Sequence, residues 1–315
     1  MRAMLWTTLW TTLRETLRAT PRRAAAFRAP KGPTEGMTEG VACSAVTTDG
    51  PAPPQHVCAA FGVGAEQLRP LSGDAGTGPL WRAGEVVLKP VPSPAEAAWV
   101  AQTLDALRVD GVRLARPLRS SDGRWVVAGW SAARYVAGRS EPRHDEVVAV
   151  SLRLHRATAH LPQPRFLANR CDVWALADRA AWGEEQPALD EAGGGAQFRE
   201  LAAARRPVNG LRPQIVHGDL FGNVLFAGNA PPAVIDFNPY WRPPEWAAAV
   251  IVVDALAWGG GDDNLINRWA ELAQWPQSLL RALLFRLAAH ALHPRSTPES
   301  LVGLDRVAKL VRQLV

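Results

Sequence analysis

Two short runs in the second half of the sequence combine residues that can bind a cation and activate a hydroxyl group. The first is HGDLFGN, from His217 to Asn223, and the second is VIDF, which contains Asp236. The apolar strand formers VLF and AVI lie between them, separated by a turn-rich stretch. If VLF and AVI pair as an antiparallel hairpin, Asn223 at its entry and Asp236 at its exit lie side by side.

The side chains that this hairpin would bring together suit phosphoryl transfer. The oxygens of Asn223 and Asp236 can bind one hard cation, and magnesium prefers a few such oxygens together with phosphate and water. Asp219, just upstream, can accept or align the proton of an attacking hydroxyl group. His217 is expected to stabilise the loop, because a histidine-aspartate metal site needs further histidines nearby and the others lie in unrelated predicted helices.

Lys89 is one of only three lysines in the chain and lies inside an apolar strand candidate, Glu85 to Val91. A lysine in this setting predicts a part-buried charge with a partner. The expected partner is Glu96, although Ser93-x-x-Glu96 also fits a capping box in which the glutamate folds back onto its own helix. A glycine-rich turn, SGDAGTG, precedes the strand candidates.

HGDLFGNVLF followed by VIDF resembles the catalytic and metal-binding loops of the aminoglycoside phosphotransferase and choline kinase-like group, relatives of the protein kinases. The run IDFNPYWRPPEW resembles an actinobacterial branch of that group. The resemblance extends over about residues 54–260 and implies a two-lobed protein kinase-like fold. It implies that Asp219 is the catalytic aspartate, that Asn223 and Asp236 bind Mg²⁺, and that Lys89 binds the phosphates of ATP.

The same resemblance implies roles for residues that carry no chemistry of their own. It assigns a loop over the phosphates to Gly73, Gly76 and Gly78, and an interlobe hinge near the adenine to Trp130, Ser131 and Ala132. The buried carboxylate of Asp254 would be satisfied by backbone amides under the catalytic loop. The chain departs from the group in having three residues, where four are usual, between Asp219 and Asn223. We therefore expect a tighter loop.

The arrangement of predicted elements indicates an α+β protein with a small antiparallel sheet followed by a larger, mainly helical part. Residues 51–132 should form the first lobe, with strand and turn signals around one helix that begins after Ser93. Residues 133–315 should form the second lobe, which holds the catalytic loop, the metal-binding hairpin and acceptor-binding helices. Helical spacing is found at 145–159, 171–182, 197–205, 264–274, 276–292 and 298–315.

Composition excludes several other classes of protein. The chain has 315 residues, 47% of them hydrophobic, and no apolar run approaches the roughly 20 residues of a membrane-spanning helix. Three widely spaced cysteines without a CxxC pair indicate neither a disulfide framework nor a zinc site, so we expect a cytoplasmic protein. Residues 1–50 carry much of the positive net charge and should form a disordered extension, but without aromatic interleaving they do not predict nucleic-acid binding.

These observations predict an ATP- and Mg²⁺-dependent phosphotransferase that acts on a hydroxyl group of a small molecule. Two alternatives keep the same fold: a non-catalytic nucleotide-binding protein, which the shortened loop would suit, and an enzyme that transfers AMP to a protein. The identity of the acceptor and the oligomeric state are not encoded in any pattern that we can interpret.

Overall fold

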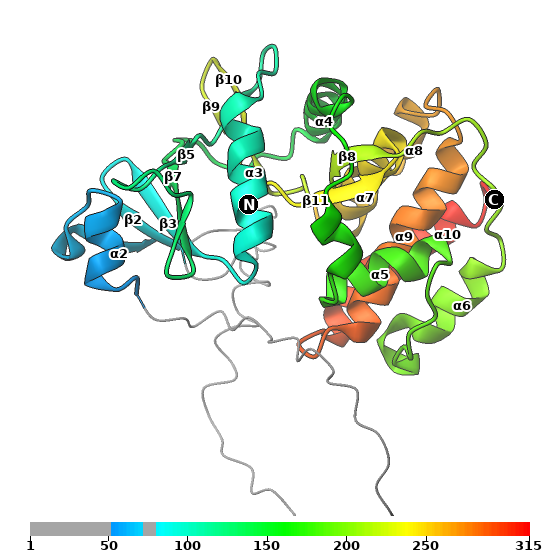
Figure 1. The fold of residues 1–315 in the computed structure, drawn as a ribbon. Helices are drawn as coiled ribbons and strands as arrows, with labels where there is room; N and C mark the ends of the chain where they lie inside the picture. The colour runs from blue at the N-terminus through cyan, green and yellow to red at the C-terminus, as the bar shows by residue number, and fades with distance from the viewer. Residues whose placement is uncertain (1–51, 72–79) are drawn as a thin grey trace, which may run out of the picture. The chain divides into compact units, whose positions relative to one another are not determined.

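The computed structural model describes residues 52–71 and 80–315. The predictions for residues 1–50 and for Gly73, Gly76 and Gly78 lie outside the described residues. Within them, the expected α+β organisation is confirmed, with an antiparallel sheet in the first part and mostly helices in the second (Figure 1).

The first sheet has six strands, all paired antiparallel, in the path β1-β2-β3-β7-β5 with β6 on β7. Its strands are β1 (Arg69–Leu71), β2 (Leu80–Ala83), β3 (Val86–Pro90), β5 (Pro117–Leu118), β6 (Val126–Val127) and β7 (Trp130–Arg134). The accompanying helices are α2 (Gln55–Ala60), the single turn η2 (Ala65–Gln67) and α3 (Pro94–Ala106). As predicted, α3 begins after Ser93, whose Oγ accepts a hydrogen bond from the Glu96 amide.

Strand β7 extends further than its sequence suggests. The interlobe hinge expected at Trp130, Ser131 and Ala132 is therefore not at these residues. Trp130, Ser131 and Ala132 lie inside β7, where Lys89 is opposite Ser131, and the chain leaves the sheet only after Arg134. The small residues after Trp130 look like the end of a strand, yet they pair with β3 through their backbone. Backbone pairing in a central strand does not need β-branched side chains, so the propensity signal was misleading here.

The predicted hairpin is confirmed as β9 (Val224–Ala227) and β10 (Ala230–Val234), joined by a turn in which Gly228 has φ +52°. A third strand, β4 (Arg113–Leu114), pairs parallel with β10 although it comes from the first part of the chain. A separate two-stranded sheet joins β8 (Gln214–His217) to β11 (Pro239–Arg242).

The chain therefore passes between the first sheet and the hairpin at two places. At the first, the Ala115 amide donates to Val234 of the hairpin, whereas the next residue, Arg116, accepts from Arg134 of β7. At the second, the Tyr135 amide still donates to Glu85 of the first sheet, and Arg139 exchanges two backbone hydrogen bonds with Phe226 of the hairpin. Residues 136–138 form the second crossing.

The helices of the second part surround a core centred on two of them. They are α4 (His144–Thr158), α5 (Val173–Trp182), α6 (Ala196–Ala202), α7 (Pro244–Ala257), α8 (Leu265–Arg268), α9 (Trp275–Leu292) and α10 (Pro298–Val311), with short turns η3 (Arg165–Asn169) and η4 (Glu191–Gly195). Helices α7 and α9 are buried along most of their length, as expected of helices that are apolar on several faces. None of the described helices is long and apolar enough to cross a membrane.

Two sequence predictions need correction here. The helix predicted at 264–274 is only the short α8, because the indole groups of Trp269 and Trp275 donate to Asp145 and to the Ile266 carbonyl and hold the following chain in turns. Cys171 is disulfide-bonded, which the wide spacing of the cysteines did not indicate, whereas Cys58 is a buried free thiol.

Candidate active site

The catalytic loop begins where β8 ends, on a chain of buried histidines. The His217 amide donates to His155 Nε2 at 2.9 Å, and His155 Nδ1 lies 3.2 Å from Ser151 Oγ. His217 Nδ1 in turn accepts the Asp219 amide at 3.1 Å. Burial lowers the pKa of His217 and lowers that of His155 to about 3, so both imidazoles are neutral acceptors at neutral pH. This geometry places His217 where a residue that supports the loop would act.

The shortened loop still holds Asn223 against Asp219. The side-chain Nδ2 of Asn223 donates to the Asp219 carbonyl at 2.7 Å, and the backbone N–H of Asn223 donates to the Leu220 carbonyl. Gly222, with φ +83°, supplies the left-handed backbone that closes the turn. Asn223 is buried, and among the described residues its Oδ1 has no hydrogen-bond partner. A buried polar oxygen without a donor needs an explanation, and a cation bound there would provide one.

The hairpin brings Asp236 back to Asn223, as predicted. Val224 and Val234 are the last paired residues, and just beyond them the Ile235 amide donates to the Asn223 carbonyl at 3.0 Å. Asp236 follows with φ +49°, a left-handed conformation that is uncommon for a residue other than glycine. Its side chain is 14% exposed. The orphaned oxygen of Asn223 and the carboxylate of Asp236 form a donor set that fits a hard divalent cation.

Lys89 reaches this donor set from β3, and its partner is not the predicted one. Its Nζ forms an ion pair with Asp236 Oδ1. Burial acts to raise the pKa of Asp236, but Lys89 outweighs it and holds the pKa below its ordinary value. Among the described residues no ion pair joins Lys89 to Glu96. Glu96 is instead close to Arg170, and burial raises its pKa.

Asp254 is paired with an arginine and not with backbone amides, so that expectation is corrected. Arg286, in α9, donates through Nε to Asp254 Oδ1 at 2.7 Å and through Nη2 to Asp254 Oδ2. The same Nη2 donates to Asp219 Oδ1 at 2.8 Å. Sequence reasoning missed Arg286. The available signal was an arginine flanked by apolar residues in LLFRLAA, where an unpaired charge would be costly.

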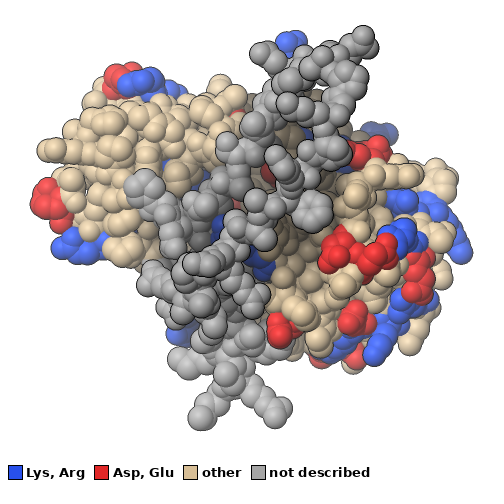
Figure 2. Space-filling view, turned by 90° about the horizontal axis from the view of Figure 1, so that it is seen from below, with Lys and Arg blue, Asp and Glu red and all other residues tan. Residues whose placement is uncertain are grey.

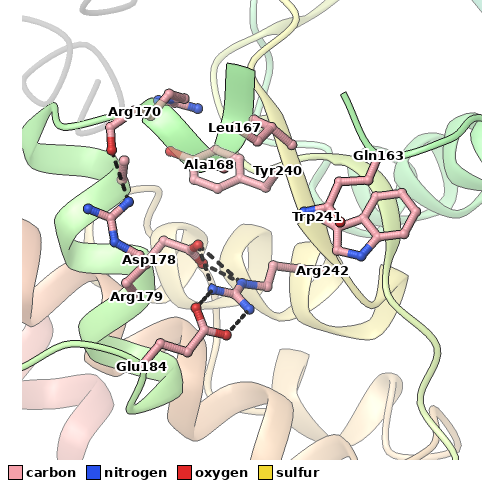
Figure 3. A pocket seen from close by; sticks show the side chains of 11 residues that line it. Gln163, Leu167, Ala168, Arg170, Asp178, Arg179, Glu184, Tyr240, Trp241 and Arg242 are labelled. Carbon is pink, nitrogen blue, oxygen red and sulfur yellow. Dashed lines mark hydrogen bonds and ion pairs between the residues drawn. The ribbon is translucent and has the colours of Figure 1, made fainter. Parts of the chain in front are cut away.

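A cavity of about 220 Å³ lies in the helical part of the chain (Figure 3). It is lined by residues of η3, α5, β11 and the segments beside them: Gln163, Leu167, Ala168, Arg170, Ala175, Asp178, Arg179, Glu184, Tyr240, Trp241 and Arg242. Tyr240 joins the cavity to the loop, because a Cβ atom added to Gly218 would lie only 2.4 Å from the Tyr240 ring. Only glycine allows this close approach beside Asp219.

The charges that line the cavity are paired within the protein. Figure 3 shows the carboxylates of Asp178 and Glu184 meeting the Arg242 guanidinium, at 2.9 and 2.6 Å. The two other arginines of the lining, Arg170 and Arg179, pair with neighbouring carboxylates at 2.9 and 2.6 Å. On the face drawn in Figure 2, acidic and basic side chains are likewise intermingled over the helical part.

The fold and the site together define a kinase-like phosphotransferase: a sheet that carries Lys89, a loop that carries Asp219, and a hairpin with Asn223 at its entry and Asp236 at its exit. Residues 67–240, more than half of the chain, match the model of the phosphotransferase enzyme family, and the chain belongs to that family. It is therefore a phosphotransferase whose acceptor is a hydroxyl group.

Solved structures of such enzymes share the fold. An amicoumacin kinase in complex with AMP-PNP and Ca²⁺ has a TM-score of 0.55 at 15% identity, covering 82% of this chain and 92% of its own. The spectinomycin phosphotransferase APH(9)-Ia bound to AMP has a TM-score of 0.53 at 10% identity, covering 82% and 96%. The aminoglycoside phosphotransferase APH(4)-Ia with AMP-PNP and hygromycin B has a TM-score of 0.52 at 15% identity, covering 82% and 98%. No curated protein matches the chain by sequence.

Proposed function

We propose that this protein transfers the γ-phosphate of Mg²⁺-bound ATP to a hydroxyl group of a small molecule. The observation that carries the proposal is the buried Asn223 Oδ1 without a hydrogen-bond partner, beside the Lys89–Asp236 ion pair. Asn223 Oδ1 and the Asp236 carboxylate would hold a divalent cation at this point, and the cation would offset charge on the phosphates. Magnesium in nucleotide sites is commonly held by one or two protein oxygens together with phosphate and water, and Asn223 and Asp236 would supply those protein oxygens.

Each residue of the site would then have a separate role. Asp219 would orient the acceptor hydroxyl and receive its proton as the bond from the acceptor oxygen to the γ-phosphorus forms and the bond from that phosphorus to the bridging oxygen of ADP breaks, so that ADP leaves. Lys89 would exchange its contact with Asp236 for one with the phosphates and offset their charge, and Asn223 and Asp236 would hold the cation. When bound, Mg²⁺ would supply charge neutralisation on the phosphates. Most of the rate gain would come from alignment and preorganised charge, as in other phosphoryl transfers.

The acceptor would bind in the cavity beside Tyr240, because the ring of Tyr240 lines this cavity and also packs closely against Gly218 of the Asp219 loop. The solved relatives are kinases and phosphotransferases named for antibiotics, which supports a small-molecule acceptor. With its lining charges already paired, the cavity offers hydrogen bonds and the aromatic surfaces of Tyr240 and Trp241. We therefore favour a neutral or weakly charged hydroxyl compound.

The proposal is tested by ATP turnover with a panel of hydroxyl-bearing metabolites, together with calorimetric binding of AMP-PNP and Mg²⁺. Asp219→Ala should lower turnover by about 100-fold or more while nucleotide binding is kept. Asp110→Ala, which alters an exposed aspartate after α3, is the matched control and should leave both unchanged. Nucleotide binding by the wild type without any turnover would favour the non-catalytic alternative, and an adenylated protein found by mass spectrometry would favour AMP transfer.

A further inference from the structure

Arg286 connects Asp219, in the loop, to the helical core. The hydrogen bonds come from two nitrogens on one edge of its guanidinium group, Nε and Nη2. Its Nε and Nη2 both bond the carboxylate of Asp254, and Nη2 also donates to Asp219 Oδ1 at 2.8 Å. An Nη nitrogen carries two hydrogens, so Nη2 can serve both carboxylates at once. The guanidinium therefore links two aspartates that lie 35 positions apart in the sequence.

The surroundings leave Arg286 little freedom. Its side chain is 6% exposed and that of Asp254 is 2% exposed. The aromatic rings of Trp174 and Phe285 lie 5.7 and 5.0 Å from the guanidinium carbon. Arginine stays charged in proteins, and a bidentate carboxylate fixes both its position and its plane. Asp254 thus holds the guanidinium in one orientation.

Asp219, by contrast, is the accessible member of the three. Its side chain is 40% exposed and lies in a loop. Only Oδ1 is bonded by Arg286, and among the described residues Oδ2 has no hydrogen-bond donor. A carboxylate held through one oxygen presents the other in a defined direction. That second oxygen is the one left to meet an acceptor hydroxyl.

We propose that Arg286 is a positioning residue for phosphoryl transfer: anchored on Asp254, it fixes the Asp219 carboxylate through Oδ1 so that Oδ2 faces the acceptor. This inference rests on the proposed function, because it assumes that Asp219 receives the acceptor hydroxyl. The simpler interpretation is that Arg286 only ties α9 to α7. That tie is already complete in the two bonds to Asp254, whereas the bond to Asp219 reaches a solvent-accessible loop and adds nothing to the packing of the two helices.

The test compares Arg286→Lys with Arg281→Lys in the full chain. Arg281 is a matched control because it lies on the same helix, is 5% exposed and donates to Gln277 and to the Arg206 carbonyl, away from the loop. Mg²⁺-ATP hydrolysis with water as acceptor gives kcat and KM, and thermal unfolding reports the fold. Arg286→Lys should lower kcat by about 100-fold with KM for ATP unchanged, because misplacement of a catalytic group costs rate rather than nucleotide affinity. Arg281→Lys should lower the Tm comparably without changing kcat.

A second variant covers the case in which Arg286→Lys does not fold. Asp254→Asn keeps the shape of the anchor but turns an amide donor towards the guanidinium, and kcat should fall by about tenfold at unchanged KM. If either folded variant keeps the wild-type kcat, or if Arg281→Lys lowers kcat as much as Arg286→Lys, the positioning role is wrong.

Crystal structures of the wild type and of the folded variants with AMP-PNP and Mg²⁺ separate this inference from the proposed function. If the wild type neither hydrolyses ATP nor phosphorylates any hydroxyl compound of the panel, the proposed function fails, yet the orientation of Asp219 can still be compared. The positioning role is supported if Asp219 keeps its contact with Arg286 in the wild type and adopts another rotamer in the variants. An Asp219 carboxylate that does not move when Arg286 or Asp254 is replaced overturns it.

Discussion

Asn223 shows why an asparagine, rather than an aspartate, suits the end of the catalytic loop. Its amide nitrogen donates to the Asp219 carbonyl, while its oxygen is left without a partner. An aspartate has oxygens only and could not do both. The residue therefore closes a loop that is one residue short and still leaves its side-chain oxygen available for the cation that the proposed function requires.

Substitutions at Asn223 should separate these two tasks. Asn223→Ala removes the oxygen, and we expect the affinity for Mg²⁺-AMP-PNP to fall by about tenfold or more. Asn223→Asp keeps an oxygen but loses the loop bond, so it should retain more of the Mg²⁺ dependence while losing about 1 kcal/mol of stability. Calorimetry with and without Mg²⁺ and urea unfolding measure the two effects. Asn229→Ala, at the exposed hairpin tip, is the control. Wild-type Mg²⁺ affinity in Asn223→Ala would contradict the assignment.

How far the sequence predicts this site depends on whether neighbours in space are also neighbours in the chain. Asp219, Asn223 and Asp236 lie within one loop and one hairpin, so local pattern places them together. The partner of Lys89 and the donor to Asp254 come from elements far apart in the sequence. Pairings of that kind are fixed by tertiary packing, which a single sequence does not display.

At the scale of elements, the histidine chain joins α4 to β8 and makes the support of the loop sensitive to acid. His155 is fully buried, and burial lowers its pKa from the ordinary value of about 6.5 to about 3. The unfolded chain binds a proton on this histidine below about pH 6.5, whereas the folded protein does not until about pH 3. Stability is therefore fully present above pH 6.5 and is lost as the pH falls towards 3.

This linkage predicts a measurable slope. Between pH 6 and pH 4.5 the contribution of His155 to the free energy of unfolding should fall by up to about 1.4 kcal/mol per pH unit. His155→Gln removes the titrating group and keeps an acceptor for the His217 amide, so its slope against pH should be shallower. His160→Gln alters an exposed histidine two residues beyond α4 and should keep the wild-type slope. Urea unfolding across this pH range measures the slope of the unfolding free energy against pH. Equal slopes in the two variants would rule out His155 as the titrating group.

Element boundaries were predictable where end signals are local. Ser93 and Pro94 mark the start of α3, and the turn-rich stretch around Gly228 marks the hairpin. The end of β7 was not predictable, because Ser131 and Ala132 are held in the sheet by β3 and not by their own propensity. The short α8 is a similar case, since indole contacts to distant residues end it.

For the whole molecule, the two crossings between the first sheet and the hairpin are where relative motion would be absorbed. Ala115 belongs to the hairpin side by its hydrogen bond, and Arg116 belongs to the sheet side. Residues 136–138 are the other crossing, and Gly138 has φ +145° with Phe226 O only 2.9 Å from where a Cβ would lie. Hinge residues of this type take up backbone rotation when a cleft closes.

Hydrogen exchange should reveal these crossings. Binding of Mg²⁺-AMP-PNP is expected to slow exchange of the amides at 136–138 by roughly tenfold, which corresponds to about 1.4 kcal/mol of added protection. The amides of Leu114 and Ala115, which stay with the hairpin, should be protected with or without nucleotide. Mass spectrometry of the exchanged chain measures both segments. An equal response in both would place the flexing point elsewhere.

The paired charges of the cavity also bear on how an acceptor is captured. Because Arg242, Arg170 and Arg179 each have a carboxylate partner, the cavity projects little field into the solvent. Long-range steering needs an excess of one sign, and without it association depends on chance encounter and short-range fit. The rate at which such an enzyme binds its acceptor should therefore change little between low and high salt concentration. Its acceptor would be selected after contact, by residence time rather than by arrival rate.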